Sequence, residues 1–259
     1  MNNQIKCMKS FYKRVSPVLV LATAFGMGVA SFSAQAAPPV NLINNGNFET
    51  GTFAGWTVLN SGSGNWSIND GTFDPPGPGG ALPAISGVYD AVSFQGGPGF
   101  HALRQIINVP NNVFAASLTW NDRVRNHAGI FSDPNQEWRV LIRDSAGTSI
   151  QEVFSTNPGD PLIQIGPNSR SGNLTGLFQR YAGQTITVSF EEQDDLFFFN
   201  ATLDDVKLLV SILPTSTNEC RDGSWETFVN VNTGAQIFKN QGDCVSFLAT
   251  KGRNPPANY

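Results

Sequence analysis

The sequence predicts an all-β protein built as an antiparallel β-sandwich. About ten short segments alternate apolar and polar residues, which is the period of a strand with one buried face. Clusters of Gly, Pro, Asn and Ser separate these segments and favour reversals of the chain. Helical periodicity is hard to find, and no internal repeat occurs. Many strands joined by turns, with few helices, are typical of two packed antiparallel sheets.

The first half of the chain holds five predicted strands. They cover residues 56–59, 65–68, 89–95, 101–109 and 113–125. Residues 71–87, between the second and third strands, are rich in Pro and Gly. No hydrogen-bonded ladder can run through so many prolines, so we expect an exposed loop there.

The second half begins with a hairpin. Strands are predicted at residues 137–143 and 149–155, joined by a turn in which Gly147 can take the positive φ of a tight reversal. A loop rich in Pro, Gly and Asn is expected at 156–176, and one helical turn at 177–182. Two long strands, 184–191 and 197–210, then close the domain. The Phe-Phe-Phe-Asn run that opens the last strand is expected to be buried on both faces or covered by a loop.

The N-terminus reads as a secretory signal peptide over residues 1–36. A basic head precedes a short apolar run, and Ala34-Gln35-Ala36 forms a small-x-small cleavage site. The sequence therefore predicts a secreted or periplasmic protein. After cleavage, 12 Lys and Arg face 20 Asp and Glu, a net charge of −8. This acidic balance argues against nucleic acid and anionic membranes as partners, and no second apolar stretch predicts membrane insertion.

Two cysteines remain after cleavage, Cys220 and Cys244. In an exported protein such a pair favours one disulfide, worth about 3 kcal/mol on the chain-entropy estimate. A two-thiolate metal site is the alternative, but His101 and His127, the chain's two histidines, lie far away in sequence. Residues 211–218 form a predicted linker, and 219–259 a small disulfide-closed unit that either stands alone or docks on the sandwich.

Three stretches resemble a known family. NGNFETGTFAGW near residue 45, AGQTITVSFEEQDD near 182 and NATLDDVKLL near 200 are similar to jelly-roll carbohydrate-binding modules. They are closer still to the galactose-binding-like domains of bacterial exported proteins. The resemblance implies one jelly-roll domain, placed here at 37–210. The tail FKNQGDCVSF, followed by NPP, is similar to a short cysteine-bearing tail of exported bacterial proteins.

A calcium site is expected where the two ends of the domain meet. Strand alternation places Asp204 on the inward face with Val206 and Leu208, and a buried carboxylate needs a cation or a proton. The resemblance implies a structural Ca²⁺ at this corner, held by Glu49 and Asp204 with nearby backbone carbonyls. The alternative is that Glu49 caps a turn and Asp204 accepts backbone N–H groups at the sheet edge.

Sugar-binding sites use exposed aromatic rings and a few polar groups. Trp66 and Tyr89 flank the proline-rich loop and are the best platform candidates, whereas Trp56, Trp120 and Trp138 are expected in the core. Arg123 and Arg125 belong to a polar strand end that either lines a groove or forms a solvated edge. We take Trp66, Tyr89, Arg123 and Arg125 as candidate ligand-binding residues.

Signals of catalysis are weak. The acidic run from Glu191 to Asp195 alternates between the two faces of its strand, and the Glu-x-Asp-x-x-Glu pattern of jelly-roll glycosidases does not occur. No nucleophile elbow, phosphate loop or zinc motif is found. The sequence therefore predicts a non-catalytic module that binds a glycan or cell-surface polysaccharide. A structural or adhesive protein contacting envelope or matrix proteins is the alternative, and a glycan hydrolase is a weaker one.

Overall fold

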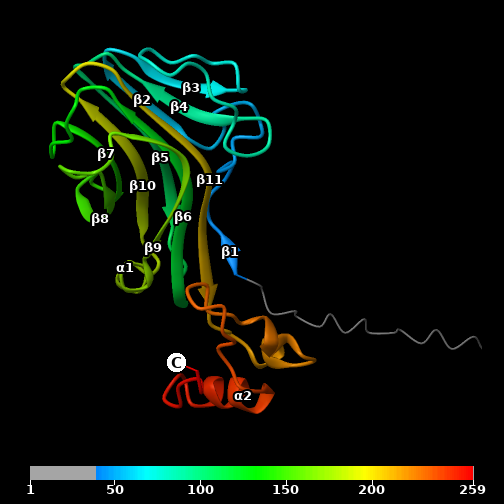
Figure 1. Ribbon diagram of the computed structural model, residues 1–259. Coiled ribbons are helices and arrows are strands. Elements are labelled where there is room, and N and C mark those ends of the chain that lie inside the picture. Colours follow the sequence, from blue (N-terminus) through cyan, green and yellow to red (C-terminus); the bar gives the residue numbers. More distant parts are fainter. Residues whose placement is uncertain (1–38, 259) are drawn as a thin grey trace, which may run out of the picture. The chain divides into compact units, whose positions relative to one another are not determined.

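The computed structural model describes residues 39–258, which fold around two facing antiparallel sheets (Figure 1). Sheet A has the strand order β3-β4-β11-β6-β9, with β1 also pairing β11. Sheet B has the order β2-β5-β10-β7-β8. The predicted antiparallel sandwich is therefore confirmed. The predicted signal peptide lies outside the described residues.

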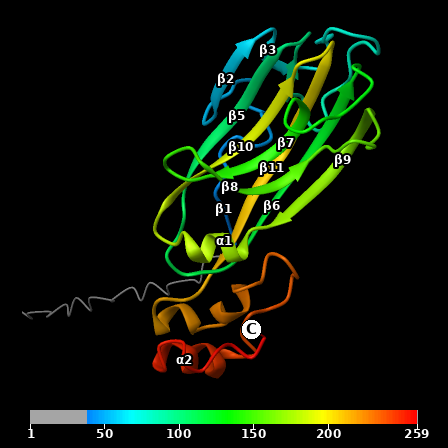
Figure 2. The same ribbon diagram turned by 90° about the vertical axis from the view of Figure 1, so that its left-hand side faces the viewer.

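The strands follow the predicted segments closely, with two additions, the short β1 and the long β9. Sheet A contains β1 (Val40–Asn41), β3 (Asn65–Asn69), β4 (Asp90–Phe94), β6 (Val113–Asn126), β9 (Ile163–Asn173) and β11 (Phe199–Ile212). Sheet B contains β2 (Thr57–Gly62), β5 (Gly99–Asn108), β7 (Gln136–Arg143), β8 (Ser149–Ser155) and β10 (Thr185–Asp194). The expected helical turn is α1 (Thr175–Arg180), at the lower end of the sandwich in Figure 2.

Aromatic side chains fill the space between the sheets. Phe190, on the central strand β10, lies 6.0 Å from Trp56, 5.8 Å from Trp120 and 6.1 Å from Trp138, measured between ring centroids. Each of these rings is at most 7% exposed, so the three tryptophans expected in the core are found there. Large buried rings contribute strongly to stability because each removes about 150–250 Å² from water.

The strand β9 corrects the prediction of a loop over residues 156–176. It is an edge strand that pairs only with β6, and most of its side chains are half-buried or exposed. An edge strand can include Pro167 because one side of its backbone needs no ladder partner. It also needs no clean apolar alternation, which is why composition alone indicated a loop.

The proline-rich segment, residues 71–88, is not a free exposed loop. It lies against the outer face of sheet A, where Phe73 packs on Phe94 at 5.1 Å between ring centroids. Asn200 Nδ2 donates to Pro76 O at 3.0 Å, and Asn69 Nδ2 donates to Leu82 O at 3.3 Å. The segment joins no ladder, as expected, but side chains of the sheet hold its carbonyl groups. We call residues 71–88 the cover segment.

A β-bulge in β11 corrects the expected direction of Asp204. The register with β6 shifts between Asp204, which pairs with Asn121, and Lys207, which pairs with Thr119. The extra residue changes the phase of alternation, so Asp204 faces the outer side of sheet A under the cover segment, while Leu208 faces the core. The bulge includes Asp205, whose φ of 52° is left-handed.

The C-terminal region forms a small unit closed by the predicted disulfide. Cys220 and Cys244 are bonded, with 5.7 Å between their Cα atoms. The unit contains the 3₁₀ helices η1 (Thr217–Cys220) and η2 (Ser224–Thr227) and the helix α2 (Gln241–Ala249). Its buried cluster includes Phe114 and Ala115 of β6, so it shares a core with the end of the sandwich. No helix in residues 39–258 is long and apolar enough to span a membrane.

Candidate functional site

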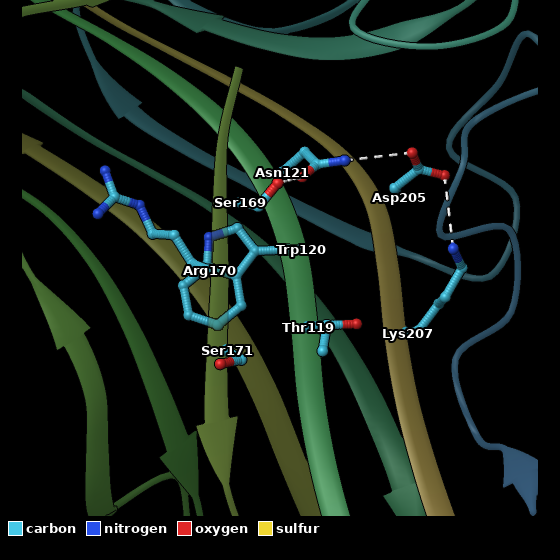
Figure 3. A pocket seen from close by; sticks show the side chains of 8 residues that line it. All are labelled: Thr119, Trp120, Asn121, Ser169, Arg170, Ser171, Asp205 and Lys207. Atoms are coloured by element: carbon cyan, nitrogen blue, oxygen red, sulfur yellow. Dashed lines mark hydrogen bonds and ion pairs between the residues drawn. The ribbon is translucent and has the colours of Figure 1, made fainter. Parts of the chain in front are cut away.

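A polar pocket of about 370 Å³ opens on the outer face of sheet A (Figure 3). Three adjacent strands, β6, β9 and β11, supply its lining. The lining residues are Thr119, Trp120, Asn121, Ser169, Arg170, Ser171, Asp205 and Lys207. Trp120 is 2% exposed, and its indole N–H already donates to Asp122; each of the other lining residues carries a hydrogen-bonding or charged side chain. The pocket is therefore suited to a ligand rich in hydroxyl groups.

A chain of hydrogen bonds crosses this pocket from β9 to β11. Ser169 Oγ lies 2.8 Å from Asn121 Oδ1, and Asn121 Nδ2 donates to Asp205 Oδ2 at 3.2 Å. Lys207 Nζ stands 3.9 Å from Asp205 Oδ1. Figure 3 shows Asn121 and Lys207 both directed at Asp205. Donors and acceptors thus alternate along a short line, which matches the alternating donor and acceptor capacity of sugar hydroxyls.

The bulge of β11 positions the acidic member of this chain. Regular alternation would place consecutive side chains on opposite faces. The left-handed backbone at Asp205 breaks that alternation, and Asp, with Asn, tolerates this conformation better than most residues. As a result Asp205 and Lys207 both reach the pocket, while Asp204 turns to the cover segment.

Arg170 links the pocket to a second one of about 610 Å³ between β8 and β9. Its Nε donates to Asp122 Oδ2 at 2.6 Å, and its Nη2 donates to Gln164 Oε1 at 2.8 Å. The guanidinium carbon also lies 3.9 Å from the centroid of Phe154. Because Asp122 is fully buried, the arginine is fixed in direction. The two pockets are therefore joined through one rigid side chain.

The two expected calcium ligands each accept hydrogen bonds from the turn at the end of the cover segment. Glu49 Oε1 accepts from Val88 N at 2.9 Å and from Tyr89 N at 3.0 Å. Asp204 Oδ2 accepts from the backbone N and the Oγ of Ser86, both at 2.9 Å. Glu49 is solvent-exposed, whereas Asp204 is fully buried. Both carboxylates therefore make the backbone contacts that the alternative prediction describes.

The same corner also offers oxygen ligands to a hard cation. Burial raises the pKa of Asp204 to about 6, and the neighbouring carboxylate of Asp205 acts in the same direction. The nearby backbone carbonyl of Gly46 accepts from Val206 N at 2.9 Å. In residues 39–258 no group of three or more His, Cys, Asp or Glu is placed to hold a metal. A calcium ion here would rely on two carboxylates, backbone carbonyls and water, a set that Ca²⁺ accepts.

The candidate platform Trp66 lies in the core. It is 4% exposed and its ring centroid is 6.1 Å from that of Trp138. The expectation that Trp66 stacks on a ligand is wrong, because β3 turns this ring between the sheets. Tyr89 is half-buried against the core, and its ring faces Gly51. Neither residue lines the polar pocket of Figure 3.

Arg123 and Arg125 hold the cover segment and are neither in an open groove nor on a solvated edge. Arg123 Nη1 donates to Pro83 O at 2.6 Å, and Arg125 Nη1 donates to Gly80 O at 2.8 Å. Arg123 Nη1 also lies 3.7 Å from Asp90 Oδ2. Both side chains are buried, at 7% and 6% exposure. Both earlier interpretations of this strand end are therefore wrong for the two arginines.

The acidic run on β10 divides between the two faces of sheet B. Glu191 faces outward and binds Arg143 at 2.7 Å, Arg139 at 3.0 Å and Arg104 at 3.1 Å. Ser189 Oγ also donates to it at 2.6 Å. Glu192 faces the interior, is fully buried, and neither carboxylate oxygen has a hydrogen-bond partner among the described residues. The expected alternation of this run is confirmed.

Sequence reasoning missed most of the pocket. Asn121 precedes Arg123 and Arg125 on the same polar strand end, for which the sequence allows a binding groove. Its residue type is therefore a sequence signal for a polar site. Ser169, Arg170 and Ser171 fell inside a predicted loop, and without β9 there was no partner for Asn121. Asp205 stood beside a residue considered for a metal, but only the bulge directs it to this face. No pattern in the sequence predicts that bulge.

Comparison with protein families finds none that matches the chain, and comparison with curated proteins finds no relative. Several solved structures are similar to it. TmCBM61 in complex with beta-1,4-galactotriose is 15% identical, with a TM-score of 0.42 over 65% of this chain and 97% of that chain. The K2 cleaved adhesin domain of Lys-gingipain is 20% identical, with a TM-score of 0.39 over 66% and 97% of the two chains.

A third similar structure is the Stig cyclase Fisc from Fischerella sp. TAU, which is 15% identical, with a TM-score of 0.43 over 67% of this chain and 98% of that chain. Carbohydrate-binding modules of the β-sandwich kind are among the similar structures. A binding module, an adhesin domain and a cyclase share the likeness. At such low identity it says nothing of a ligand.

Proposed function

We propose that this protein is an exported, non-catalytic module that binds a glycan in the polar pocket between β6, β9 and β11. The observation that carries the proposal is the chain of alternating donors and acceptors from Ser169 through Asn121 to Asp205 and Lys207. Its members come from a rigid sheet, so they keep their relative positions without a ligand. The extension toward Arg170 and the second pocket gives room for more than one sugar unit.

The absence of catalysis is part of the proposal. The carboxyl groups whose pKa burial raises to about 6 are Asp90, Asp194 and Asp204. All three are fully buried and none of them lines the polar pocket. A glycosidase needs a raised acid and a second carboxylate on either side of the scissile bond. The pocket brings in one carboxylate, Asp205, and that one is already engaged with Asn121 and Lys207.

The test is a glycan array, followed by calorimetry on the glycan that binds best. Asn121→Ala removes the central member of the hydrogen-bond chain, and we expect about tenfold weaker binding. Asp205→Asn keeps a residue that tolerates the left-handed backbone while removing the charge. Asn108→Ala, on the exposed surface of β5 in sheet B, is the matched control. Unchanged affinity in both pocket variants would place the binding site elsewhere.

We further propose a structural calcium ion at the corner of Glu49 and Asp204. It would link the start of the domain to its last strand and remove the cost of the buried Asp204 carboxylate. An ion present at about 100 times its dissociation constant stabilises by about 2.7 kcal/mol. EDTA should therefore lower the melting temperature of the wild type by several degrees and leave Glu49→Gln almost unchanged. Equal melting of the wild type with and without EDTA would rule the ion out.

The second candidate function is a structural or adhesive role in the envelope or matrix. The C-terminal unit, which shares a core with Phe114 and Ala115 of the sandwich, favours it, because this unit adds a further surface that the polar pocket does not need. A pull-down of envelope proteins by the wild type that survives Asn121→Ala, combined with an empty glycan array, would favour this role. The disulfide is consistent with either role outside the cytoplasm.

A further inference from the structure

The turn between β10 and β11 exposes two large apolar side chains. Leu196 is 49% exposed and Phe197 is 58% exposed. Ile130, from the connection between β6 and β7, is also 49% exposed. Phe197 is the one aromatic side chain of residues 39–258 that falls in the exposed class. We call Ile130, Leu196 and Phe197 the apolar platform. The sequence prediction that the Phe-Phe-Phe-Asn run is covered holds for Phe199 and fails for Phe197.

A buried amide pair ties the parts of the platform together. Gln136 Oε1 accepts from the backbone N of Asp195 and of Leu196, both at 3.1 Å. Its Nε2 donates to Leu196 O at 3.3 Å and to Asn126 Oδ1 at 3.2 Å. Asn126 Nδ2 in turn donates to Ile130 O at 2.6 Å. Since Gln136 and Asn126 are at most 1% exposed, both connections share one rigid support.

The backbone at Phe197 is held in an unfavourable conformation. Its φ is 55°, in the left-handed region that bulky residues rarely adopt and that glycine adopts without steric strain. The ring packs against Phe198 with 4.7 Å between centroids, at an angle of 53°. A glycine would satisfy the turn better, so stability does not explain the aromatic side chain. The exposure of the ring and the strain of its backbone together indicate that Phe197 has a function at the surface.

The size of the platform decides which partner fits. Three side chains, each about half-exposed, offer at most a few hundred Å² of apolar surface. A stable protein–protein interface buries about 1,200–2,000 Å² in total, so a second copy or a protein partner would need much more. The net charge of −8 without the signal peptide opposes an anionic membrane. The apolar face of one sugar ring matches one exposed aromatic ring.

We propose that the apolar platform stacks against the C–H face of a neutral sugar, as a second contact for the ligand of the polar pocket. This inference rests on the proposed glycan-binding function. Phe197 of the platform, just before β11, and Asp205 of the pocket are eight residues apart along the chain, roughly 27 Å at the rise of a strand. One sugar ring therefore touches one site or the other. The ligand that uses both is an oligosaccharide.

The test compares variants of the whole protein on short linear β-linked oligomers of glucose, galactose, mannose and xylose. Phe197→Gly removes the ring and relieves the backbone, so we expect about tenfold weaker binding together with a higher melting temperature. A gain in stability with a loss of affinity separates this result from misfolding. Phe197→Trp should retain binding. Ile106→Ala, which removes a 68% exposed side chain from β5, is the control and should change neither quantity.

The outcomes separate the platform from the function on which it rests. If Asn121→Ala weakens binding and Phe197→Gly does not, the platform is wrong and the glycan-binding pocket stands. If the wild type binds none of these oligomers and nothing on the array, both proposals fail. Sedimentation with phosphatidylcholine vesicles that is lost in Phe197→Gly, with sugar binding unchanged, would assign the platform to lipid and overturn the sugar contact.

Discussion

Glu191 and Glu192 are neighbours on β10, and both are fully buried, yet their surroundings are opposite. Three arginines and a serine hydroxyl surround Glu191 on the outer face of sheet B. Glu192 points between the sheets, and neither of its carboxylate oxygens has a hydrogen-bond partner among the described residues. Both side chains are shielded from solvent, and Glu192 lies deeper, between the sheets. The comparison shows that charged partners can hold a buried carboxylate in its ionised form.

The pKa values follow this difference. Burial by itself would raise the pKa of Glu191, but the hydrogen bond from Ser189 and the guanidinium groups of Arg143 and Arg139 outweigh it and hold this pKa below its usual value. Burial raises the pKa of Glu192 well above its usual value, and the nearby carboxylate of Asp194 adds to the effect, while the amide of Gln95 opposes it without outweighing it. One residue of displacement along the strand thus separates a stabilised anion from a disfavoured one.

The largest effect is expected from Glu191→Gln. This change keeps the shape of the side chain but leaves three guanidinium groups without their shared anion. Breaking a buried ion pair by removing one partner costs about 3–5 kcal/mol, and because the arginines are 16–26% exposed we expect the lower end. Urea unfolding at neutral pH measures the loss. A change below about 1 kcal/mol would mean that water already screens this network.

A smaller effect of opposite sign is expected from Glu192→Gln. The amide carries no charge, so the cost of keeping an unpaired carboxyl group in the interior falls. We expect the free energy of unfolding to rise by about 1–3 kcal/mol at neutral pH. Glu137→Gln, on the outer face of β7, is the control, and there the ion pair with Arg139 should be lost. A destabilised Glu192→Gln protein would show that the glutamate has a partner that the fold alone does not supply.

The smallest effect on the free energy of unfolding, counted per carboxyl group, is expected from a change of pH. A carboxyl whose folded pKa is raised contributes stability below its unfolded pKa, and that stability is lost as the pH rises through the folded value. Asp90, Asp194 and Asp204 all rise from 3.8 to about 6. Glu192 acts in the same direction and Glu191 in the opposite one, since its lowered pKa costs stability only in stronger acid.

In the presence of EDTA, the four raised carboxyl groups should favour pH 5 over pH 7.5 by about 1 kcal/mol each. His101 and His127 oppose them, because burial lowers the pKa of both imidazoles and each costs stability in acid. With four groups against two, the wild type should be more stable near pH 5. Chemical unfolding at the two pH values measures this difference. Glu192→Gln should show a smaller difference than the wild type. Stability that increases from pH 5 to pH 7.5 would contradict the raised pKa values of these carboxyl groups.

The sequence predicted the fold well wherever a strand buries one face. The strands β5, β6, β7 and β10 alternate clearly because one side of each packs on Phe190 and its neighbours, and the tryptophans expected in the core are found there. The disulfide followed from an isolated pair of cysteines. The edge strand β9 was missed, since exposure on both faces removes the alternation that marks a strand.

The candidate site was less predictable, for reasons that particular residues show. Arginine is a residue type typical of a binding groove, but the guanidinium groups of Arg123 and Arg125 donate to backbone carbonyls of the cover segment. Trp66 has the residue type of a sugar platform, but β3 turns it inward. Asp205 and Ser169 are ordinary surface residues in the sequence, and they meet at one pocket only because β11 and β9 flank β6.

Three features follow from the residues alone: the class of fold, the core and the disulfide. Each depends on a local property, namely the period of the apolar residues, the volume of the side chains or an isolated pair of cysteines. Which polar residues share a surface follows only from the folded chain. A bulge of one residue sends Asp204 under the cover segment and Asp205 into the pocket, and one step along β10 gives Glu191 three arginines and Glu192 none. The energy of a polar group depends on its neighbours in space, and only the fold brings those neighbours together.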